Sequence, residues 1–455
     1  MRARWIAATA AALALGAGAA SLDDDRGRER DIADLAAKHG GVRVDVDRPV
    51  EVIPLYQRDK RIHGLTPFQA LVDATPDGGT LTPPPGSYAG PVRVTRPMTI
   101  DGRGAVVIDA GGKGTVLRLD TDGATLAGLR LTGSGDSHDS DDACVNVRGN
   151  RNRIENLVID DCLFGIDLKQ ASGNTVRGNR VRSKPLALGL RGDGLRLWTS
   201  HDNLIEDNDI TESRDVVAWY SKRNVFRGNR GSASRYSIHF MFSDDNLVEG
   251  NRFVGNTVGV YLMYTERTHV RRNVITHANG PAGMGIGFKE TSDTDIEGNE
   301  IVYCAVGVGS DLSPFQPDTT IRFTGNRFAY NGVGLLFTSE LGGNVLVDNR
   351  FEGNVTHVAY AGGAPASERN RWADNYWDDY QGFDRDGDGR GDTAHELYAY
   401  ADRLWMELPF AMFFRNAPSL ELLDFLERLA PFASPRLLLR DASPRYRRPA
   451  VASHG

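Results

Sequence analysis

Four similar hexapeptides decide how this chain folds: NTVRGN (174–179), NLIEDN (203–208), NVFRGN (224–229) and NLVEGN (246–251). Each begins and ends with asparagine and has an apolar third residue. The pattern continues through THVRRN (268–273), TDIEGN (294–299), IRFTGN (321–326), NVLVDN (344–349) and NRWADN (370–375). The closing asparagines run from 179 to 375 in eight steps, a period of about 24 residues. Repeats of this length, in a chain with 51 glycines, are typical of a solenoid.

Each repeat has room for two short strands but not for a helix, because its apolar segments are only a few residues long. We therefore predict an all-β fold, a right-handed single-stranded parallel β-helix of about ten coils over residues 80–375. The apolar residues of successive hexapeptides should stack in its core: Val176, Ile205, Phe226, Val248 and Val270. The asparagines should form side-chain ladders at the turns, which is a structural role.

The chain divides into four predicted segments: a signal peptide (1–20), a polar segment (21–63), the β-helix (64–375) and a C-terminal module with an Asp-rich loop and amphipathic helices (376–455). Arg2 and Arg4 precede an apolar run and then small residues, which predicts export to the periplasm with cleavage near residues 19–22. A membrane anchor is disfavoured because the run is short and rich in alanine. In TPFQALVDA (66–74), Thr66 is the predicted N-cap of a short helix that covers the first coil.

Composition and motifs exclude several classes of function. The net charge of −7 argues against nucleic-acid binding. The chain has no P-loop, no H-E-x-x-H and no C-x-x-C motif, so ATP hydrolysis, zinc proteolysis and thiol redox chemistry lack their usual residues. Three cysteines, Cys144, Cys162 and Cys304, are too few for a disulfide scaffold. One pair can form in an oxidising compartment, but we expect three small buried hydrophobic residues.

The outward positions of the strands between the hexapeptides carry candidate metal ligands. In SIHFMF (237–242), strand alternation turns His239 and Met241 outward. The next coil, GVYLMY (259–264), places Met263 beside Met241. Because stacked coils lie about 4.8 Å apart, both sulfurs and the imidazole can approach one ion. Thioether and imidazole suit Cu(I) better than calcium or magnesium, so we predict a transient Cu(I) site of His239, Met241 and Met263.

Two tryptophans, Trp198 and Trp219, belong to the same outward column, and we predict that they form a surface for a partner. Two other interpretations remain open. In one, the methionines and tryptophans only pack against a loop or a partner. In the other, the tryptophans stack on sugars, as in a polysaccharide lyase or epimerase. Such lyases usually need clustered carboxylates together with a Lys or Arg base, and this column shows no such cluster.

The stretch DRDGDGRGD (384–392) has the spacing of a calcium loop, with aspartates at positions 1, 3 and 5 and Gly389 at position 6. The predicted calcium ligands are Asp384, Asp386, Asp388, the carbonyl of Arg390, and Asp392. Position 12 is His395, where a bidentate glutamate is expected. The alternative is a solvated acidic turn. We also interpret the stretch GSGDSHDSDD (133–142), which gathers four aspartates around His138, as a solvated turn between coils, with metal binding as the alternative.

The C-terminal segment is more apolar than a solenoid cap requires. LELLDFLERL (420–429) places Leu422, Leu423, Phe425, Leu426 and Leu429 on one helical face, opposite Glu421, Asp424, Glu427 and Arg428. An apolar face of this size predicts docking to a partner or a membrane edge, with Phe425 and Leu426 in the contact.

Taken together, the chain resembles the nitrous-oxide-reductase maturation proteins of the NosD family. The motifs that carry this resemblance are RGDGLRLW (191–198), SRYSIHFMFS (234–243), VGVYLMY (258–264), GMGIGFKE (283–290), DLSPFQP (311–317), NYWDDYQGFDRDGDGRGD (375–392), YADRLWM (400–406) and LDFLERLAPF (423–432). They cover roughly residues 64–440, whereas residues 23–60 match nothing in the family.

The resemblance implies a periplasmic β-helix without catalytic activity. Such proteins act with an ABC-type permease and its ATPase, and with a copper chaperone lipoprotein, to assemble the copper centres of nitrous oxide reductase. It implies contact with the membrane only through the permease, and it leaves open whether sulfur is also handled. It strengthens the case for a copper site but does not say which residues hold the metal. A secreted polysaccharide lyase or epimerase and a purely structural adaptor are the competing functions.

Overall fold

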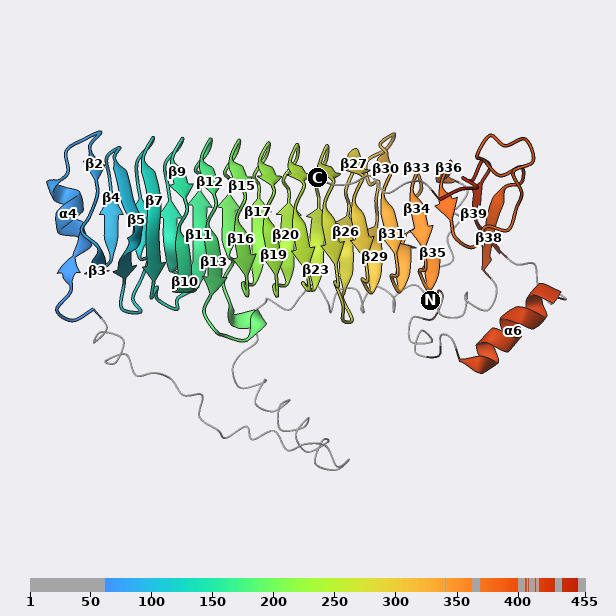
Figure 1. Ribbon diagram of the computed structural model, residues 1–455, viewed down its shortest axis with the longest axis horizontal. Coiled ribbons are helices and arrows are strands. Elements are labelled where there is room, and N and C mark those ends of the chain that lie inside the picture. The colour runs from blue at the N-terminus through green and yellow to red at the C-terminus, as the bar shows by residue number, and fades with distance from the viewer. Residues whose placement is uncertain are drawn as a thin grey trace, which may run out of the picture. The chain divides into compact units, whose positions relative to one another are not determined.

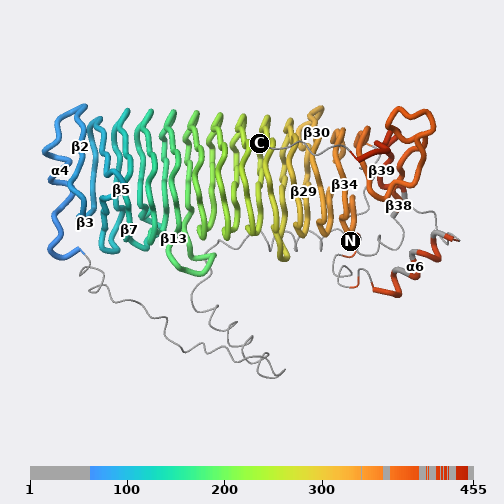
Figure 2. Tube along the Cα trace, viewed as in Figure 1, coloured from blue at the N-terminus to red at the C-terminus, as the bar shows by residue number. Residues whose placement is uncertain are grey.

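The structure is a computed structural model that describes residues 62–339, 341–361, 369–399, 406, 408, 414, 417–429 and 436–448. The predicted signal peptide and the polar segment up to residue 61 lie outside the described residues. Parallel coils stack one on another along a single axis (Figures 1 and 2). No helix among the described residues is both long enough and apolar enough to span a membrane.

One sheet, here called sheet B, contains one strand from each of twelve successive coils, and all neighbouring strands in it are parallel. Its strands are β4 (Val92–Val94), β6 (Leu117–Leu119), β8 (Ala143–Val147), β11 (Phe164–Lys169), β14 (Leu195–Trp198), β17 (Asp215–Trp219), β20 (Tyr236–Met241), β23 (Val258–Met263), β26 (Met284–Lys289), β29 (Val306–Asp311), β32 (Val333–Phe337) and β35 (Thr356–Tyr360).

The second sheet, sheet A, contains two short strands from most coils. The first set is β9 (Arg153–Glu155), β12 (Thr175–Arg177), β15 (Leu204–Glu206), β18 (Val225–Arg227), β21 (Leu247–Glu249), β24 (His269–Arg271), β27 (Thr294–Glu297), β30 (Ile321–Thr324), β33 (Asn344–Val347) and β36 (Arg371–Ala373). The second set is β10 (Val158–Cys162), β13 (Arg180–Ser183), β16 (Asp209–Thr211), β19 (Arg230–Ser232), β22 (Arg252–Val254), β25 (Val274–Thr276), β28 (Glu300–Val302), β31 (Arg327–Ala329), β34 (Arg350–Glu352) and β37 (Tyr376–Trp377). The first coils contribute β1 (Thr66–Pro67), β2 (Thr80–Leu81), β3 (Gly86–Ala89), β5 (Thr99–Asp109) and β7 (Thr125–Thr132).

The asparagines of the hexapeptides form the predicted ladders. The side-chain nitrogen of Asn229 donates to the Oδ1 of Asn251 at 3.0 Å, and that of Asn251 donates to the Oδ1 of Asn273 at 2.9 Å. Each rung also caps a buried backbone carbonyl, as Asn251 does for Phe226 at 3.0 Å. The predicted core residues pair in register from coil to coil and are buried: Val176, Ile205, Phe226, Val248 and Val270. The parallel β-helix is thereby confirmed.

Two details of the predicted repeat are wrong. Sheet B alone has twelve strands, so there are more coils than the predicted ten. The additional coils lie near the N-terminus, where no asparagine hexapeptide marks them. Most repeats have three strands rather than two, because the turn at the closing asparagine divides the first predicted strand into one strand before it and one after it, as β12 and β13 flank Asn179.

The two ends of the stack have different caps. At the N-terminal end the helix α4 (Phe68–Ala74) buries Phe68 and Val72. Thr66 is not its N-cap, as predicted, but lies with Pro67 in β1, which pairs with β3, and the helix has no side-chain cap. At the C-terminal end, β38 (His395–Ala399) and β39 (Arg436–Asp441) pair in antiparallel fashion, and β39 also pairs with β36.

Asp441 of β39 ends the long asparagine ladder. Its Oδ2 accepts hydrogen bonds from the backbone and side-chain nitrogens of Asn375, both at 3.0 Å, and from the indole nitrogen of Trp377 at 3.2 Å. An ionised carboxylate suits this position because its oxygens are rich in lone pairs and it brings no donor of its own. Two further elements lie outside the sheets. They are the helix α6 (Pro418–Leu429) and the 3₁₀ turn η1 (Leu188–Leu190), which connects β13 to β14.

The expectation of three free cysteines is wrong for one pair. Cys144 and Cys162 form a disulfide between successive coils, with a Cα–Cα distance of 5.6 Å, and only Cys304 is a buried free thiol. Disulfides of this kind persist in oxidising compartments, which agrees with the predicted export.

Candidate functional site

The outer face of sheet B has the register that the sequence predicts. Trp198 pairs with Trp219, Trp219 with Met241 and Met241 with Met263, in successive coils. The neighbouring column pairs His239 with Tyr261. Each of these side chains therefore lies one strand spacing, about 4.8 Å, from the next along the stack.

A stack of aromatic rings, which we call the aromatic ladder, borders this face and was not predicted. Tyr220, Phe242 and Tyr264 follow the column residues at the corner after β17, β20 and β23, and all three have positive φ. Their rings stack at centroid distances of 5.2 and 4.8 Å with interplanar angles of 9° and 12°. Because the rings face one another, they present mainly their edges to solvent, whereas sugars stack on ring faces. The aromatic ladder therefore does not favour the carbohydrate-binding interpretation.

His239 points away from the core but is covered by two tyrosines. Its ring lies 4.9 Å from that of Tyr236 and 5.9 Å from that of Tyr261, centroid to centroid, and the side chain is only 9% exposed. Neither ring nitrogen has a hydrogen-bond partner among the described residues, although both are buried. A buried imidazole with two unpaired nitrogens is costly, on the order of 1–3 kcal/mol for each group. Such a group requires an explanation, and a role in binding a ligand is one.

The surroundings of His239 keep its imidazole neutral. Burial lowers the pKa of His239 from 6.5 to about 4. The negative charge of Asp215 opposes this shift, and the positive charge of Arg235 adds to it by a smaller amount. A neutral imidazole is the form that binds metals. The side chains of Met241 and Met263 are half-buried on the adjacent strands.

The pKa of His239 leads to a pH prediction. The folded-state pKa, about 4, lies below the ordinary value of 6.5, so the folded protein binds this proton less well than the unfolded chain does. The contribution of His239 to the free energy of unfolding is therefore fully present above pH 6.5, and it is lost as the pH falls from 6.5 towards 4. It amounts to about 3 kcal/mol. We expect His239→Phe to remove this part of the pH dependence when free energies of unfolding are compared between pH 4 and 7. Parallel curves for the two proteins would contradict the assignment.

Two carboxylates lie on the coils that precede that of His239. Asp193 and Asp215 are both buried, and Arg214 lies 2.9 Å from Asp193 and 3.7 Å from Asp215. Burial raises the pKa of Asp193 to about 6, despite the attraction of Arg214. Asp215 also accepts a hydrogen bond from the Nε of Arg235 at 2.9 Å. Carboxylates that are buried and bound to arginine are poor candidates for a general acid and base that must reach a sugar.

The loop at 133–142 is only in part the solvated turn that we predicted, because ion pairs also hold it. Its exposed residues are Asp136, His138, Asp139 and Ser140. Lys184 donates to Asp136 at 2.5 Å and to the carbonyl of Ser134 at 2.7 Å. Asp141 binds Arg196 of sheet B at 2.7 Å and Lys169 at 3.1 Å. The loop is therefore held against the outer face of sheet B by ion pairs. Sequence spacing could not reveal this, because the partners lie 28 to 55 residues away in the chain.

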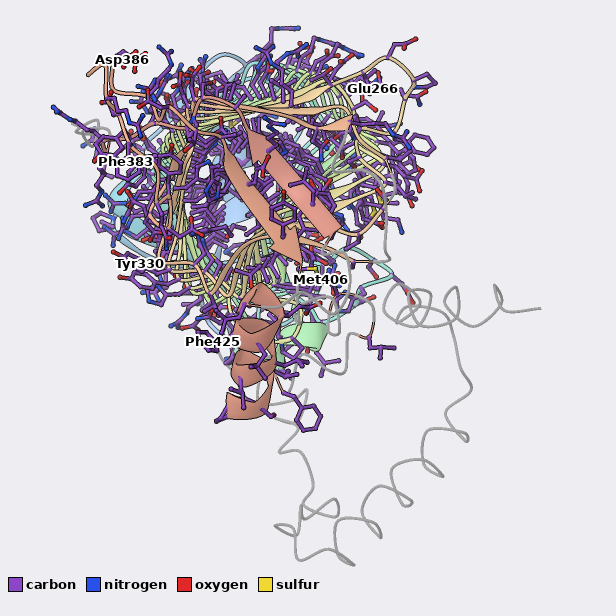
Figure 3. All side chains as sticks on the ribbon, turned by 90° about the vertical axis from the view of Figure 1, so that its right-hand side faces the viewer. Glu266, Tyr330, Phe383, Asp386, Met406 and Phe425 are labelled. Carbon is purple, nitrogen blue, oxygen red and sulfur yellow. A yellow bond between two sulfur atoms is a disulfide. The ribbon has the colours of Figure 1, made fainter. Side chains whose placement is uncertain are left out.

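The predicted calcium loop brings its first three carboxylates together. Oxygens of Asp384, Asp386 and Asp388 lie within 4.8 Å of one another, and the backbone nitrogen of Gly389 donates to Asp384 at 3.1 Å. Gly389 has φ +85°, which a side chain would rarely adopt. Asp392 instead accepts a hydrogen bond from the backbone nitrogen of Arg385 at 2.9 Å. Asp386 lies on the outer surface near the C-terminal end of the stack (Figure 3).

Helix α6 exposes the apolar residues of its predicted face. Leu422, Leu423, Phe425, Leu426 and Leu429 are all exposed, and Phe425 is labelled in Figure 3. Glu427, predicted on the opposite, polar face, is buried. The apolar face that the sequence predicts is therefore present, and its described residues are exposed.

Parallel coils, with the candidate site on the outer face of one sheet, define this chain as a parallel β-solenoid protein. Two relatives are both described as "Probable ABC transporter binding protein NosD". The one from Pseudomonas aeruginosa is 30% identical over 406 residues, covering 80% of this chain and 88% of the relative. The one from Stutzerimonas stutzeri is 26% identical with the same coverage. Residues 181–382 match the family model "Periplasmic copper-binding protein (NosD)". The chain belongs to the NosD family.

Among solved structures, the A-modules of two mannuronan C-5 epimerases from Azotobacter vinelandii resemble this chain. The first has a TM-score of 0.54 at 17% identity and covers 69% of this chain and 96% of the module. The second has a TM-score of 0.50 at 18% identity and covers 67% and 98%. At these identities the likeness establishes a shared β-solenoid fold and not a shared chemistry.

Proposed function

We propose that this chain is a periplasmic accessory protein that binds Cu(I) transiently on the outer face of sheet B and passes it to the copper centres of nitrous oxide reductase. The proposed ligands are His239, Met241 and Met263. The observation that carries the proposal is the buried, neutral imidazole of His239, whose nitrogens lack partners among the described residues, in register beside two stacked methionines.

The donor set fits copper as cargo. Thioether sulfur and imidazole nitrogen are soft or borderline ligands that select Cu(I) over calcium and magnesium. Neither carries a charge that would hold the ion tightly, and a carrier needs to release it. Tyr236 and Tyr261 limit access of water to the imidazole, and the half-buried methionines offer the open side.

The comparisons support the proposal at the level of the family. The matching family model is described as periplasmic and copper-binding, and both relatives are described as ABC transporter binding proteins. We infer that the partners of this chain are an ABC-type permease with its ATPase, a copper chaperone lipoprotein and nitrous oxide reductase. Trp198, Trp219 and the aromatic ladder would then form the surface that receives copper-bearing partners.

The alternative functions are disfavoured by specific contacts. A lyase or epimerase requires an accessible acid and base, whereas Asp193 and Asp215 are buried and bound to arginine. A structural adaptor without copper leaves the acceptor nitrogen of the neutral His239 ring, which is unpaired among the described residues, without a ligand. We therefore assign no catalytic residue to this chain.

Copper binding is tested by titrating the purified chain with Cu(I) in competition with a chromophoric chelator. We expect saturable binding of Cu(I) and no competition by Ca²⁺ or Mg²⁺ at this site. If the chain does not bind Cu(I), the structural adaptor is the better description of its function. If the chain turns over uronate polymers in an ultraviolet assay, it is a lyase or epimerase instead.

Docking to the permease is predicted to depend on α6. Leu426→Asp places a charge in the proposed apolar contact. Burying an unpaired polar group in a dry interface costs on the order of 2–7 kcal/mol, so the substitution should prevent docking. We expect loss of co-purification with the permease, while the β-solenoid folds and is exported. Leu190→Asp is the matched control, because Leu190 is an exposed leucine in η1. If the Leu426→Asp variant still co-purifies with the permease, the assignment of α6 as the docking helix is refuted.

Calcium is proposed as a stabilising ion of the loop at 384–392. A ligand that binds only the folded state raises its stability, by about 2.7 kcal/mol at a hundred times the Kd. A chelator should therefore lower the Tm of the wild type, and Asp386→Ala should abolish this difference. Asp139→Ala, which changes an exposed aspartate outside this loop, should leave the effect of the chelator on the Tm unchanged. If the chelator leaves the wild-type Tm unchanged, the loop is a solvated acidic turn.

A further inference from the structure

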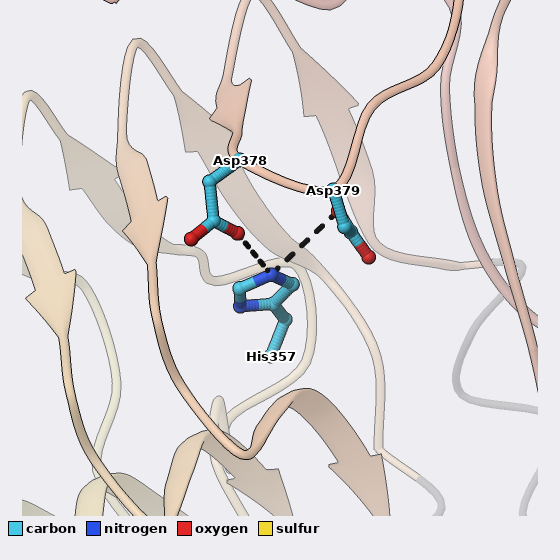
Figure 4. A group of neighbouring side chains, drawn as sticks. All are labelled: His357, Asp378 and Asp379. Carbon is cyan, nitrogen blue, oxygen red and sulfur yellow. Dashed lines mark hydrogen bonds and ion pairs between the residues drawn. The ribbon is translucent and has the colours of Figure 1, made fainter.

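Four ionisable side chains that the proposed function does not use meet at the C-terminal end of the stack. His357 belongs to β35, Asp378 and Asp379 follow β37, and His395 begins β38. Both imidazoles are only 7% exposed. The aspartates are more open, with side-chain exposures of 37% and 49%. Figure 4 shows His357 between the two carboxylates.

The distances in this cluster leave room for an ion. His357 Nε2 lies 2.9 Å from Asp378 Oδ1, an ordinary hydrogen bond. Asp379 Oδ1 lies 3.6 Å from His357 Nε2 and 3.6 Å from His395 Nε2. These separations are too long for hydrogen bonds. They are close to the spacing of about 3.4 Å between two ligand atoms of a tetrahedral zinc ion bound at about 2.0–2.1 Å.

The end of an asparagine ladder determines the role of His357. The side-chain oxygen of Asn354 accepts two hydrogen bonds from Asn331, from its backbone and side-chain nitrogens, both at 3.0 Å. The side-chain nitrogen of Asn354 therefore faces the other way, towards the carbonyl of Phe328 at 2.8 Å and His357 Nδ1 at 3.3 Å. Nδ1 must accept, so the proton of His357 lies on Nε2 and is donated to Asp378. His357 orients a carboxylate and does not offer a lone pair to a metal.

His395 does offer one. Its Nε2 is buried and makes no hydrogen bond within the described part of the chain. The ring stacks on Trp377 at a centroid distance of 4.7 Å and an angle of 23°, and the indole of Trp377 is itself held by Asp441. The imidazole is thus rigidly placed, with its unpaired nitrogen directed at Asp379. A cleft of about 500 Å³, lined by Asp379, Tyr380 and His395 among others, leads to it from solvent.

We propose that this cluster is a second metal site, which binds a divalent transition-metal ion of the Zn²⁺ or Cu²⁺ class. His395 Nε2 and Asp379 Oδ1, which lie 3.6 Å apart, are the direct ligands. Water completes the coordination, and His357 is a positioning residue that holds Asp378, which contacts the ion through water. One imidazole nitrogen, one carboxylate and water suit Zn²⁺ or Cu²⁺ better than the soft Cu(I) ion. Outer partners such as the His357–Asp378 pair are usual around the ligands of such sites. The ion would join β38 to the last coils, and this role is independent of the proposed Cu(I) site.

The proposal is tested on the full purified chain, stripped with a chelator and titrated with Zn²⁺ and then with Cu²⁺ by calorimetry. We expect one Zn²⁺ site that Ca²⁺ does not occupy, and no saturable Zn²⁺ binding by His395→Ala. His357→Gln should weaken binding about 10-fold, as loss of an outer contact does. His269→Ala is the matched control, because His269 forms an exposed pair with Asp295, with Nδ1 and Oδ2 3.2 Å apart. Unchanged Zn²⁺ binding by His395→Ala would overturn the proposal.

Two further measurements keep the proposal falsifiable if His395→Ala folds poorly. The first is electron paramagnetic resonance of the Cu²⁺-loaded wild type, in which one coordinated nitrogen is expected. Two coordinated nitrogens would make His357 a ligand and overturn the assigned roles. The second is the Asp386→Ala variant, which should still bind Zn²⁺. Loss of Zn²⁺ binding there would place the ion in the loop at 384–392 instead.

Discussion

Replacing Met241 and Met263 together by leucine should weaken Cu(I) binding roughly 100-fold, the equivalent of about 1.4 kcal/mol for each lost sulfur ligand. Leucine has nearly the volume of methionine, so the side chains still fill their half-buried positions on β20 and β23. The loss therefore reports coordination and not packing. The measurement is the competition titration with Cu(I), accompanied by the Tm and by the copper content of the reductase matured with this variant.

Met284→Leu is the control for the paired substitution. Met284 begins β26, on the coil after Met263, but it pairs with Val258 and Val306 and so lies outside the column of Met241 and Met263. The Met284→Leu variant should bind Cu(I) as tightly as the wild type does. If the double variant also binds copper normally and matures an active reductase, the two methionines are packing residues and the copper site lies elsewhere.

Asn251→Leu should destabilise the β-solenoid by about 3 kcal/mol or more, because several buried polar groups lose partners at 1–3 kcal/mol each. Asn251 accepts hydrogen bonds from the backbone and side-chain nitrogens of Asn229, at 2.8 and 3.0 Å, and donates to Phe226 and Asn273. Leucine fills a similar space but satisfies none of these groups.

The effect of Asn251→Leu is measured as a fall in the urea midpoint and in resistance to proteolysis, since a long repeat array need not unfold in two states. Asn279→Leu serves as the control, because Asn279 is an exposed asparagine in the turn before β26. A variant at 251 as stable as the control would show that the ladder contributes little to folding.

The fold could be predicted because the same small set of residues recurs in every coil. The asparagine at each turn and the apolar residue before it fix which side chains face inward, and stacking then places Phe226 beside Val248 and Met241 beside Met263. The coil count was wrong because the coils of β4 and β6 close without the asparagine hexapeptide. The disulfide was missed because nothing in the spacing of Cys144 and Cys162 shows that they meet on adjacent coils.

The candidate site was predictable only where it follows the repeat. The columns of Trp219, Met241 and His239 are periodic and could be aligned from the sequence. The cover of His239 by Tyr236 and Tyr261 depends on side-chain conformation, which periodicity does not encode. The cluster of His357, Asp379 and His395 was missed for a different reason. His357 lies on β35 within the regular repeats, but Asp379 follows β37 and His395 begins β38, after the last hexapeptide. Only the end of the stack brings the three residues together.

The most direct test of the proposed copper site is X-ray absorption spectroscopy of the chain loaded with one equivalent of Cu(I). The proposed ligands predict a three-coordinate ion with two thioether sulfurs and one imidazole nitrogen, and loss of both sulfur scatterers in the Met241→Leu, Met263→Leu variant. A copper spectrum with only nitrogen and oxygen neighbours, or one unchanged in that variant, would contradict a copper site at His239, Met241 and Met263.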